Sequence, residues 1–562
     1  MAALRAAGTG TVGGLVGLLL GVLVLGPALA PGYTLHYDLV VVPDLDLSPR
    51  TLGTDGSVPR AVPNDLLVAL GSLVLPGWLV QKVLLLGAFV LGGAGAGRLA
   101  GSGVGAAAAA TWWSWNPWVG ERLGIGHWGY LLGFALLPWV LLAAARVRST
   151  GSGIPALVAT LTAAALGGST PGVLATLLAL LVVLTPGGPG APRLRHVGVV
   201  LGTALLTNAA WWWPFLVAAS READPAGVGA FSAAGDTPFG PVGSLLLGGG
   251  LWNDRTWFVE RTTWPVAFAA LLAVILVLGL ALRRRAWWHD PVSRGATVAG
   301  VVGLVVAGLG AVPGGHALLE WLITSVPGAG LLRDGQKFVA LWVLLLAVAL
   351  ARVVDGLRAD RVPAVVLAVA VVWPVATLPT LAWGHAGAWG SVAWPDEVEV
   401  VRTRLAASGD PVAVFPWSTY RQYAWNEDRV LLDPWNRLLP QAVVSDDRLP
   451  LRDQGVVAGE DPVAGEVTDA LESGADVESV LRRHGVRWVI VQTDQPAPEG
   501  SVPEIADDPD LVLGDLEVHD LDPSASQPPP TTDPWRALGL GGTGAAVLLA
   551  VGLLWRDRSR ET

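Results

Sequence analysis

The sequence has no cysteine, only two lysines and few charged residues for its length. The absence of cysteine excludes disulfides, thiolate nucleophiles and cysteine-ligated metal sites. Charged residues make up 15% of the 562 residues, against about 25% in soluble globular proteins. Because 52% of the residues are apolar, the missing charge indicates a surface that never meets water. We therefore predict a protein of the lipid bilayer.

The charge that is present is divided unevenly along the chain. Residues 384–535 hold 28 Asp and Glu against 10 Lys and Arg, and the other residues hold 18 against 26. One part is therefore strongly acidic and the other mildly basic. Binding of nucleic acid needs clustered Lys and Arg that displace counterions, so this distribution excludes nucleic acid as a partner.

Long apolar runs recur along the chain, and a run of about 20 residues is needed to cross the hydrocarbon core. Roughly twelve runs are candidate spans by this criterion. They cover residues 11–30, 78–97, 103–118, 128–145, 154–167, 172–185, 197–217, 264–282, 295–312, 336–354, 362–380 and 536–555. The runs at 103–118, 154–167 and 172–185 are short. The first run ends in Ala28-Leu29-Ala30, as a cleavable signal peptide does, but Pro31 follows directly and we expect the segment to be retained.

The acidic region differs in character from the spans. Short apolar runs at 411–415 and 486–491 are typical of strands, and residues 466–484 carry a helical pattern that ends at Gly485. Residues 520–534 are rich in proline and predict an extended linker. The predicted fold class is an α-helical polytopic membrane bundle of about 12 spans with a small extracytoplasmic α/β domain.

The arginines indicate which side each loop faces. With the N-terminus inside, 16 basic residues fall on the cytoplasmic side against five acidic ones, which is the excess expected there. These basic residues are Arg5, Arg98, Arg146, Arg148, Arg193, Arg195, Arg283, Arg284, Arg285, Arg294, Arg352, Arg358, Arg361, Arg556, Arg558 and Arg560. We therefore predict a multi-pass protein of the cell membrane with both termini in the cytoplasm.

Three parts follow from this orientation. Residues 1–380 form the multi-span domain, residues 381–535 the acidic outward domain with its linker, and residues 536–562 the last transmembrane helix and a cytoplasmic tail. The outward loops of the first part are 31–65, 218–262 and 313–335. Function is expected in these loops and in the outward domain.

Acidic residues follow directly on the first span. Tyr33-Thr34-Leu35-His36-Tyr37-Asp38 is followed by Pro43-Asp44-Leu45-Asp46. A carboxylate at the mouth of a span stays ionised close to the lipid head groups, so Asp38, Asp44 or Asp46 can accept the proton of an attacking hydroxyl. Asp44 and Asp46 also form a DxD, which can hold a divalent cation. These acids can equally be solvated loop residues or helix caps. His36 is a candidate substrate-binding residue in the same loop.

Two further outward loops carry candidate site residues. Arg333 and Lys337 are four residues apart where a loop enters a span, so on a helical turn they share a face and can clamp a lipid phosphate. Snorkelling of two interfacial cations is the alternative. Glu260 is a candidate second carboxylate and Arg255 a candidate substrate-binding cation, and ordinary loop charges are the alternative for both.

Tryptophans cluster near the predicted ends of spans. They are Trp112, Trp113, Trp115, Trp118 and Trp128 around one outward loop, and Trp211, Trp212 and Trp213 at the end of the seventh run. Anchoring at the bilayer interface explains most of them, and stacking on a sugar ring is the alternative. His127 is a lone outward histidine without metal-ligand spacing, and its default interpretation is structural.

Several segments are familiar as a set. They are Asn116-Pro117-Trp118-Val119-Gly120-Glu121-Arg122-Leu123, Gly126-His127-Trp128-Gly129, Leu136-Leu137-Pro138-Trp139, the run from Asn208 to Pro214, and the run from Leu331 to Phe338. Over residues 11–380 they resemble multi-spanning glycosyltransferases of the GT-C class, in particular actinobacterial arabinofuranosyltransferase-like and YfhO-type membrane proteins.

The resemblance implies a function and one site residue. It implies inverting transfer of a sugar from a polyprenyl-phosphate donor to a cell-envelope glycan or lipid acceptor on the outer face, without an organic cofactor and with a divalent cation left open. It also implies a catalytic acid in the first outward loop. Of two acids four apart in the arabinofuranosyltransferase pattern, Asp38 matches the second, and Thr34 stands at the first. The alternative is a non-catalytic envelope scaffold or lipid-glycan transporter whose outward domain binds glycan or protein.

Overall fold

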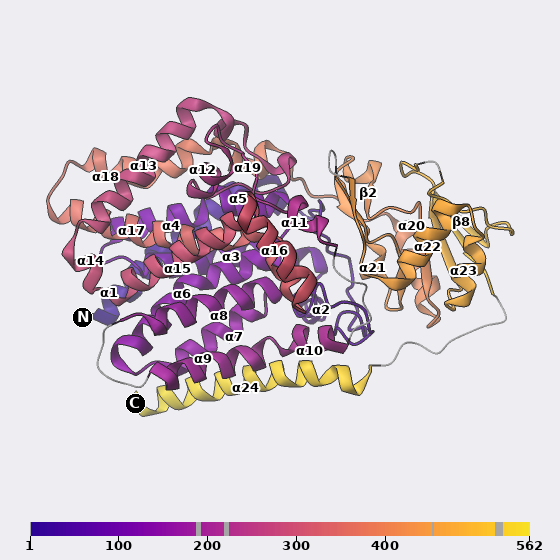
Figure 1. The fold of residues 1–562 in the computed structure, drawn as a ribbon, viewed down its shortest axis with the longest axis horizontal. Helices are drawn as coiled ribbons and strands as arrows, with labels where there is room; N and C mark the ends of the chain where they lie inside the picture. The colour runs from indigo at the N-terminus through magenta and orange to yellow at the C-terminus, as the bar shows by residue number, and fades with distance from the viewer. Residues whose placement is uncertain are drawn as a thin grey trace.

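The computed structural model describes residues 2–186, 193–217, 224–451, 455–498, 500–522 and 532–561. It consists of a helical bundle and a smaller α/β domain that follow one another along the long axis (Figure 1). Both chain ends lie at the end of the bundle that is farthest from the domain (Figure 1). The loops that the sequence predicts to face outward are therefore expected at the opposite end, against the domain.

The helices of the bundle have the following bounds. They are α1 (Ala2–Leu25), α2 (Asn64–Ser72), α3 (Gly77–Gly97), α4 (Gly103–Ser114), α5 (Pro117–Gly124), α6 (Trp128–Thr150), α7 (Ile154–Ala165), α8 (Ser169–Leu184), α9 (Arg193–Thr207), α10 (Ala209–Val217), α11 (Ala226–Ala230), α12 (Gly240–Leu246), α13 (Trp264–Leu282), α14 (Arg285–His289), α15 (Pro291–Gly308), α16 (Pro313–Ser325), α17 (Val339–Ala359), α18 (Ala364–Thr377), α19 (Ala382–Ala386) and α24 (Pro534–Glu561). Short 3₁₀ turns in the loops are η1 (Gly26–Leu29), η2 (Asp254–Thr256), η3 (Val259–Thr262), η4 (Leu309–Ala311), η5 (Ala329–Leu332), η6 (Gly335–Phe338) and η7 (Pro379–Leu381).

All twelve predicted runs are helical, but they are not all equivalent spans. Within the described residues, seven helices are long and apolar enough to cross a membrane, and the number rises to nine if each of two bent pairs is one span. The bent pairs are α9 with α10, at 64°, and α18 with the η7–α19 segment, at 69°. The three runs that are short in sequence become the short helices α4, α7 and α8. They are too short to span alone, so length and composition do not support twelve full spans.

Glycine lets the first two long helices pack backbone to backbone. A Cβ added at Gly13 would lie 2.2 Å from the carbonyl oxygen of Gly93, and one at Gly17 would lie 2.2 Å from that of Phe89. No side chain larger than hydrogen fits at such distances, as expected for small-residue stripes in membrane helices. The small-residue stripe on α1 therefore serves packing against α3.

The C-terminal helix α24 packs against the break between α9 and α10 and forms hydrogen bonds to its backbone groups. It runs beside α7, α9 and α10 (Figure 1). Thr543 Oγ1 accepts a hydrogen bond from the backbone N–H of Ala210 at 3.0 Å and donates to the carbonyl of Thr207 at 3.1 Å. These groups lie on the two sides of the break between α9 and α10. A hydroxyl from α24 thus satisfies backbone groups that lipid cannot.

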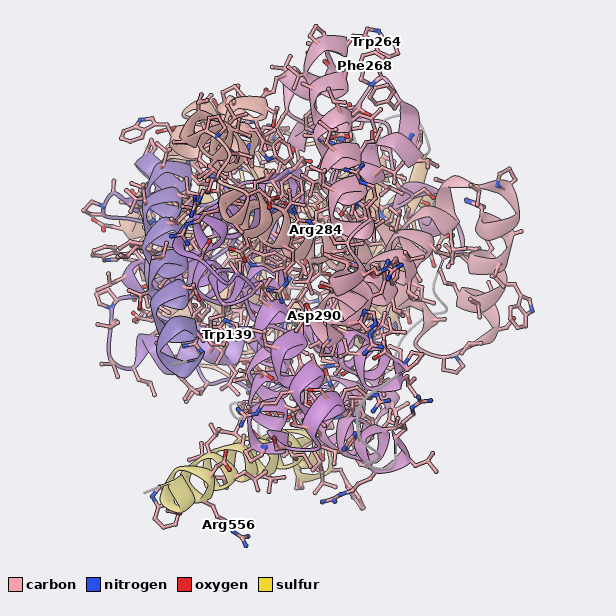
Figure 2. The ribbon with its side chains drawn as sticks, turned by 90° about the vertical axis from the view of Figure 1, so that its left-hand side faces the viewer. Trp139, Trp264, Phe268, Arg284, Asp290 and Arg556 are labelled. Carbon is pink, nitrogen blue, oxygen red and sulfur yellow. The ribbon has the colours of Figure 1, made fainter. Side chains whose placement is uncertain are left out.

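The tryptophans around α4 and α5 correct one prediction. Trp113 and Trp118 are 2% and 0% exposed, and both stack on Phe134 of α6, with ring centroids 3.8 and 4.5 Å apart. They form core packing rather than an interfacial belt, because α4 and α5 are surrounded by other helices. In contrast, Trp264 and Phe268 lie on the outer surface of α13, 56% exposed each (Figure 2).

The α/β domain is built on a mixed five-stranded sheet. Its elements are α20 (Asp396–Ala406), β1 (Val412–Phe415), β2 (Tyr420–Gln422), β3 (Val430–Leu432), α21 (Trp435–Leu438), β4 (Val443–Val444), β5 (Leu449–Leu451), β6 (Gly455–Val457), α22 (Pro462–Ser473), α23 (Val477–Arg483), β7 (Trp488–Gln492), β8 (Leu511–Leu513) and β9 (Leu516–Asp520). The strand order is β4-β1-β7-β9-β8, with β4, β1 and β7 parallel. The predicted strands become β1 and β7, and the predicted helix is two helices. Part of the predicted linker, 523–531, lies outside the described residues.

The first outward loop lies between the bundle and the domain. Tyr33 and Val392 exchange backbone hydrogen bonds of 2.7 and 2.9 Å. Arg437 of the domain donates to Asp65 at the start of α2, with 2.9 Å between Nε and Oδ2. The loop after the first span is therefore held both by the segment that leads into the domain and by the domain itself.

The opposite end of the bundle is rich in arginine. Figure 2 faces this end and labels Arg284, Asp290 and, near the end of α24, Arg556. Arg352 donates to Asp290 at 2.9 Å, so part of the positive charge is paired. The domain and these arginines thus occupy opposite ends. That the arginine-rich end faces the cytoplasm is the prediction made from the arginine excess.

Candidate functional site

Asp38 sits at the tip of a tight two-residue turn in the first outward loop. The backbones of His36 and Leu39 exchange hydrogen bonds of 3.3 and 2.8 Å, which leaves Tyr37 and Asp38 as the two central residues. Tyr37 has a φ of 42°, in the left-handed region that glycine usually takes in such turns. A bulky residue there is strained by about 1–3 kcal/mol, and such strain persists only where the surroundings impose it.

The domain supplies part of what imposes this strain. The N–H of Tyr37 donates to the carbonyl of Val430 at 2.6 Å, and the N–H of Leu432 donates to the carbonyl of Tyr37 at 2.9 Å. Tyr37 thus adds to the β2–β3 hairpin beside β3. Asn426, which is fully buried, also donates from its side-chain amide to the carbonyl of Leu35 at 3.2 Å. The domain therefore fixes the backbone that presents Asp38.

The bundle holds the same turn from the other side. The N–H of Asp38 donates to the carbonyl of Ile125 at 3.1 Å, at the end of α5. Gly126 follows with a φ of 84°, and a Cβ built on it would lie 2.2 Å from the backbone nitrogen of Leu39. Only glycine permits both this backbone conformation and this approach. The short helix α5 and Gly126 therefore set the position of Asp38 against the bundle.

The Asp38 carboxylate heads a chain of hydrogen bonds into the bundle. Its Oδ2 lies 3.1 Å from His127 Nε2, and His127 Nδ1 lies 3.0 Å from an amino group of Arg122. A guanidinium can only donate, so Nδ1 must accept and the imidazole proton is on Nε2. His127 therefore donates to Asp38 from Nε2. The Asp38 side chain remains 36% exposed, which leaves its other oxygen open to a ligand.

Arg122 is buried and shared among several acceptors. It donates to Asp334 from both amino groups, at 2.7 and 3.1 Å, and to the side-chain oxygen of Gln336. Burial alone would raise the pKa of Asp334, but the guanidinium of Arg122 outweighs it and holds the pKa below the usual value. Asp334 is thus ionised, and its carboxylate holds the guanidinium of Arg122 in place.

Lys337 adds a second buried cation beside this pair. Its side chain is 5% exposed, and its ammonium donates to Thr170 Oγ1 at 3.3 Å. In the part of the chain that the structure describes, no carboxylate forms an ion pair with it. An ammonium carries three donors, so donors remain free for a ligand. Asp334 balances the charge of Arg122, so the charge of Lys337 remains available for an anion at this end of the bundle.

A second buried carboxylate cluster lies behind Gln336. Gln336 donates to Glu121 at 3.0 Å, and Arg261 binds Asp236 at 2.5 and 3.1 Å. Burial, followed by the negative charge of Asp236, raises the pKa of Glu121 well above its ordinary value. Glu121 therefore keeps its proton, because one arginine cannot balance two buried carboxylates. This cluster supports α5, and it is sealed from solvent.

The other predicted acids of the first loop face the domain. Asp44 and Asp46 lie 3.8 and 3.7 Å from the guanidinium of Arg402 on α20, and their side chains are 69% and 48% exposed. Burial raises the pKa of Asp46 somewhat, against the effect of Arg402. Both therefore act as surface partners of the domain in this structure, whereas Asp38 alone is joined to His127.

Arg333 and Lys337 do not share a helical face. Arg333 follows η5 and Lys337 lies within η6, so no helical turn spans the two. Arg333 pairs with Glu460 of the domain at 3.3 Å, and its guanidinium lies over the ring of Phe231. The two residues therefore do not form the predicted joint clamp. Lys337 is buried in the bundle, and Arg333 forms an ion pair with the domain.

Glu260 lies in η3, which packs on α13, and Arg255 lies in η2, which packs on α5. Glu260 accepts hydrogen bonds from the backbone N–H and hydroxyl of Thr380 at 3.1 and 2.8 Å, so it caps η7. Arg255 lies in η2 with an exposed side chain. The structure does not bring either residue to the contacts of Asp38.

Thr34 and His36 are both buried beneath the loop. Thr34 is 1% exposed and its hydroxyl accepts from Lys82 at 3.1 Å, so position 34 points into the protein. His36 is 5% exposed, stacks on Trp389 and donates from Nε2 to the carbonyl of Leu123 at 2.8 Å. His36 therefore anchors the loop to α5 and is not available to a substrate, which corrects the predicted role.

The protonation of His36 makes a pH-dependent contribution to stability. Its Nδ1 has no hydrogen-bond partner, and burial lowers the pKa of His36 from 6.5 to about 4. Between pH 6.5 and about 4 the unfolded chain binds more protons at His36 than the folded protein does. The free energy of unfolding is therefore highest above pH 6.5 and falls as the pH drops toward 4. We expect a loss of about 2 kcal/mol between pH 7 and pH 5 from this residue alone.

The check is a comparison of thermal midpoints at pH 7 and pH 5 for the wild type and His36→Gln. Glutamine can still donate to the carbonyl of Leu123 but does not titrate. The variant should lose less stability on acidification than the wild type. Equal losses would show that His36 is not held neutral.

The sequence predicted Asp38 and Lys337 as candidates but did not predict that His127, Arg122 and Asp334 form a hydrogen-bonded chain with Asp38. The only available signal was their place in the segments 116–129 and 331–338, which carry the family resemblance. The spacing of these residues in the sequence does not predict the contacts. Arg122 contacts His127 across the end of α5, and it contacts Asp334 of a loop that is distant in the sequence.

Known structures share this architecture. The mycobacterial arabinofuranosyltransferase AftD is similar with a TM-score of 0.53 and 17% identity, over 91% of this chain and 40% of that chain. A mutant form of AftD gives a TM-score of 0.53 at 18% identity, over 91% and 41% of the two chains. The fold is that of a GT-C glycosyltransferase. The resemblance inferred from the sequence is confirmed at this level.

This chain spans about two fifths of the length of AftD. The archaeal oligosaccharyltransferase AglB from Archaeoglobus fulgidus, solved with an inhibitory peptide and a dolichol-phosphate, is more distant, with a TM-score of 0.38 and 12% identity over 86% of this chain and 69% of its own. No family model and no curated protein sequence matches the chain. The GT-C fold thus rests on structure.

Proposed function

We propose that this protein is a membrane glycosyltransferase that moves a sugar from a polyprenyl-phosphate donor to a hydroxyl of a cell-envelope glycan or lipid acceptor, on the outer face and with inversion. The observation that carries the proposal is that Asp38, hydrogen-bonded by His127, is linked through His127 to the buried Arg122, and that the buried Lys337 lies three residues beyond Asp334, the partner of Arg122. A base and a cationic pocket in one place suit displacement of a phosphate by a hydroxyl.

Asp38 is the general base of this proposal. One carboxylate oxygen is held by His127 at 3.1 Å, and the other takes the proton of the acceptor hydroxyl as that oxygen attacks the anomeric carbon. His127 is a positioning residue, because it donates to the carboxylate and is itself fixed by Arg122. General base catalysis of this kind contributes about 10²–10⁴-fold in rate.

Lys337 and Arg122 stabilise the leaving group. The bond from the anomeric carbon to the phosphate oxygen breaks, and the carrier leaves as a polyprenyl phosphate. Cations that are already in place meet the charge that develops there without reorganisation. Asp334 keeps Arg122 in position. Within the described residues no group of three or more metal-ligating side chains occurs, and the charge balance proposed here uses protein cations.

Transfer by the purified protein tests the proposal. Wild-type protein in lipid nanodiscs is incubated with farnesyl-phosphoryl sugars, one pentofuranose and one hexopyranose, and with octyl glycosides as acceptors. Mass spectrometry should find one added sugar in the product with at least one donor, and NMR of its anomeric centre should show inversion. No product from any donor, with folded protein, would favour the non-catalytic scaffold or lipid-glycan transporter.

The two predicted phosphate-binding cations are expected to behave differently. Lys337→Met removes a buried ammonium with free donors, so we expect the donor KM to rise about tenfold or more, as for a lost charged hydrogen bond. Arg333→Met is the matched control, because Arg333 is committed to Glu460. It should leave the donor KM within about twofold of the wild type. Donor kinetics at fixed acceptor distinguish the two, and equal effects would mean that both cations hold the donor.

A further inference from the structure

The wall of the site that faces the domain contains a tyrosine with no assigned role. Tyr420 begins β2, which pairs with β3, and Tyr37 pairs with the other side of β3. The rings of Tyr37 and Tyr420 meet edge to face, with centroids 6.2 Å apart. Because Tyr37 directly precedes Asp38, this contact places Tyr420 beside the catalytic turn, across from the bundle residues.

The hydroxyl of Tyr420 is neutral and free. Burial, followed by the negative charge of Asp38, raises the pKa of Tyr420. The residue is half-buried. In the described part of the chain its hydroxyl makes no hydrogen bond. By contrast, the hydroxyl of Tyr423 in the same hairpin donates to Gln492 at 2.5 Å. One hydroxyl serves the domain core, and the other, on the ring that contacts Tyr37, has no protein partner among the described residues.

We propose that Tyr420 binds the acceptor, donating a hydrogen bond to a sugar hydroxyl next to the one that Asp38 deprotonates. This inference rests on the proposed function. The acceptor rather than the donor is the ligand, because the cations for a phosphate, Arg122 and Lys337, come from the bundle, whereas Tyr420 comes from the outward domain. The acceptor class is a glycan with neighbouring free hydroxyls.

A consequence is that the domain is part of the active site and not an appended binding module. The same hairpin that carries Tyr420 also holds Tyr37 through two backbone hydrogen bonds. Acceptor binding and the geometry of the base are therefore set by one element. The matched pair Tyr420→Phe and Tyr423→Phe separates these effects, since each removes one hydroxyl from the same hairpin and keeps the ring.

The experiment measures acceptor binding and transfer in parallel. Wild type, Tyr420→Phe and Tyr423→Phe in nanodiscs are titrated with an octyl disaccharide by saturation-transfer NMR, and acceptor KM is measured with the farnesyl-phosphoryl sugars. We expect Tyr420→Phe to weaken acceptor binding and raise acceptor KM about fivefold, with donor KM unchanged, as for one lost hydrogen bond. Tyr423→Phe should lower thermal stability and leave acceptor KM unchanged.

The outcomes separate this inference from the proposed function. If the wild type transfers sugar and Tyr420→Phe keeps the wild-type acceptor KM, the role of Tyr420 is refuted and the enzyme stands. If the wild type binds the disaccharide without transfer and Tyr420→Phe weakens binding, the tyrosine site stands and the enzyme is refuted. If the wild type does neither, both are overturned.

Discussion

Replacing Asp38 by Asn is expected to reduce kcat for sugar transfer by about 10³-fold, within the range of general base catalysis. Asparagine keeps the size of the side chain and can still accept from His127 Nε2, so the turn should remain. It cannot take the proton of the acceptor hydroxyl. The donor and acceptor KM values should change little, because neither the cationic pocket nor Tyr420 is altered.

Asp44→Asn and Asp46→Asn are the matched controls. They lie in the same loop and lose the same charge, but their carboxylates face Arg402 of the domain. Each should retain transfer within about twofold of the wild type, since weak surface ion pairs contribute about 0–1 kcal/mol. If either variant lost as much transfer as Asp38→Asn, the assignment of Asp38, the residue joined to His127, as the general base would be contradicted.

Gly126→Ala is expected to abolish transfer through structure rather than chemistry. The new Cβ would lie 2.2 Å from the nitrogen of Leu39, and the φ of 84° is unfavourable for alanine. Backbone cannot yield as a flexible side chain can, so the turn of Asp38 must move away from α5. Since a misplacement of about 1 Å can cost about 10²-fold in rate, we expect at least that loss in kcat.

Gly87→Ala provides the control for this substitution. A Cβ at Gly87 of α3 meets no atom within 4 Å, and alanine is the better helix former. It should retain full transfer and stability. Limited proteolysis of the loop should increase in Gly126→Ala and not in Gly87→Ala. Wild-type activity in Gly126→Ala would contradict the fixed position of the Asp38 turn.

The sequence predicted the membrane character, the runs that become helices and two of the three interior strands of the domain sheet, because hydrophobic length and periodicity are local properties. It marked the runs that become α4, α7 and α8 as short but still counted them among about twelve spans, since a short helix buried by its neighbours is as apolar as one that crosses the membrane. For the same reason it assigned Trp113 and Trp118 to the bilayer interface.

At the site, the sequence predicted single residues better than their partnerships. Asp38 and Lys337 stand out because an acid or a lysine at a membrane mouth is rare. Arg333 could not be assigned to Glu460, nor His127 to Asp38, because these pairs join segments that only tertiary packing brings together. Tyr420 carried no signal, since its position depends on how the β2–β3 hairpin meets the first loop.

The most direct test of the account is made in the source organism. Lipid extracts and envelope glycans from a strain that lacks the protein are compared by mass spectrometry with the same strain carrying the wild type or Asp38→Asn at equal membrane abundance. We predict that a polyprenyl-phosphate-linked sugar accumulates and a glycan is truncated in the deletion and in Asp38→Asn, and that the wild type reverses both. Full reversal by Asp38→Asn would contradict transfer at this site.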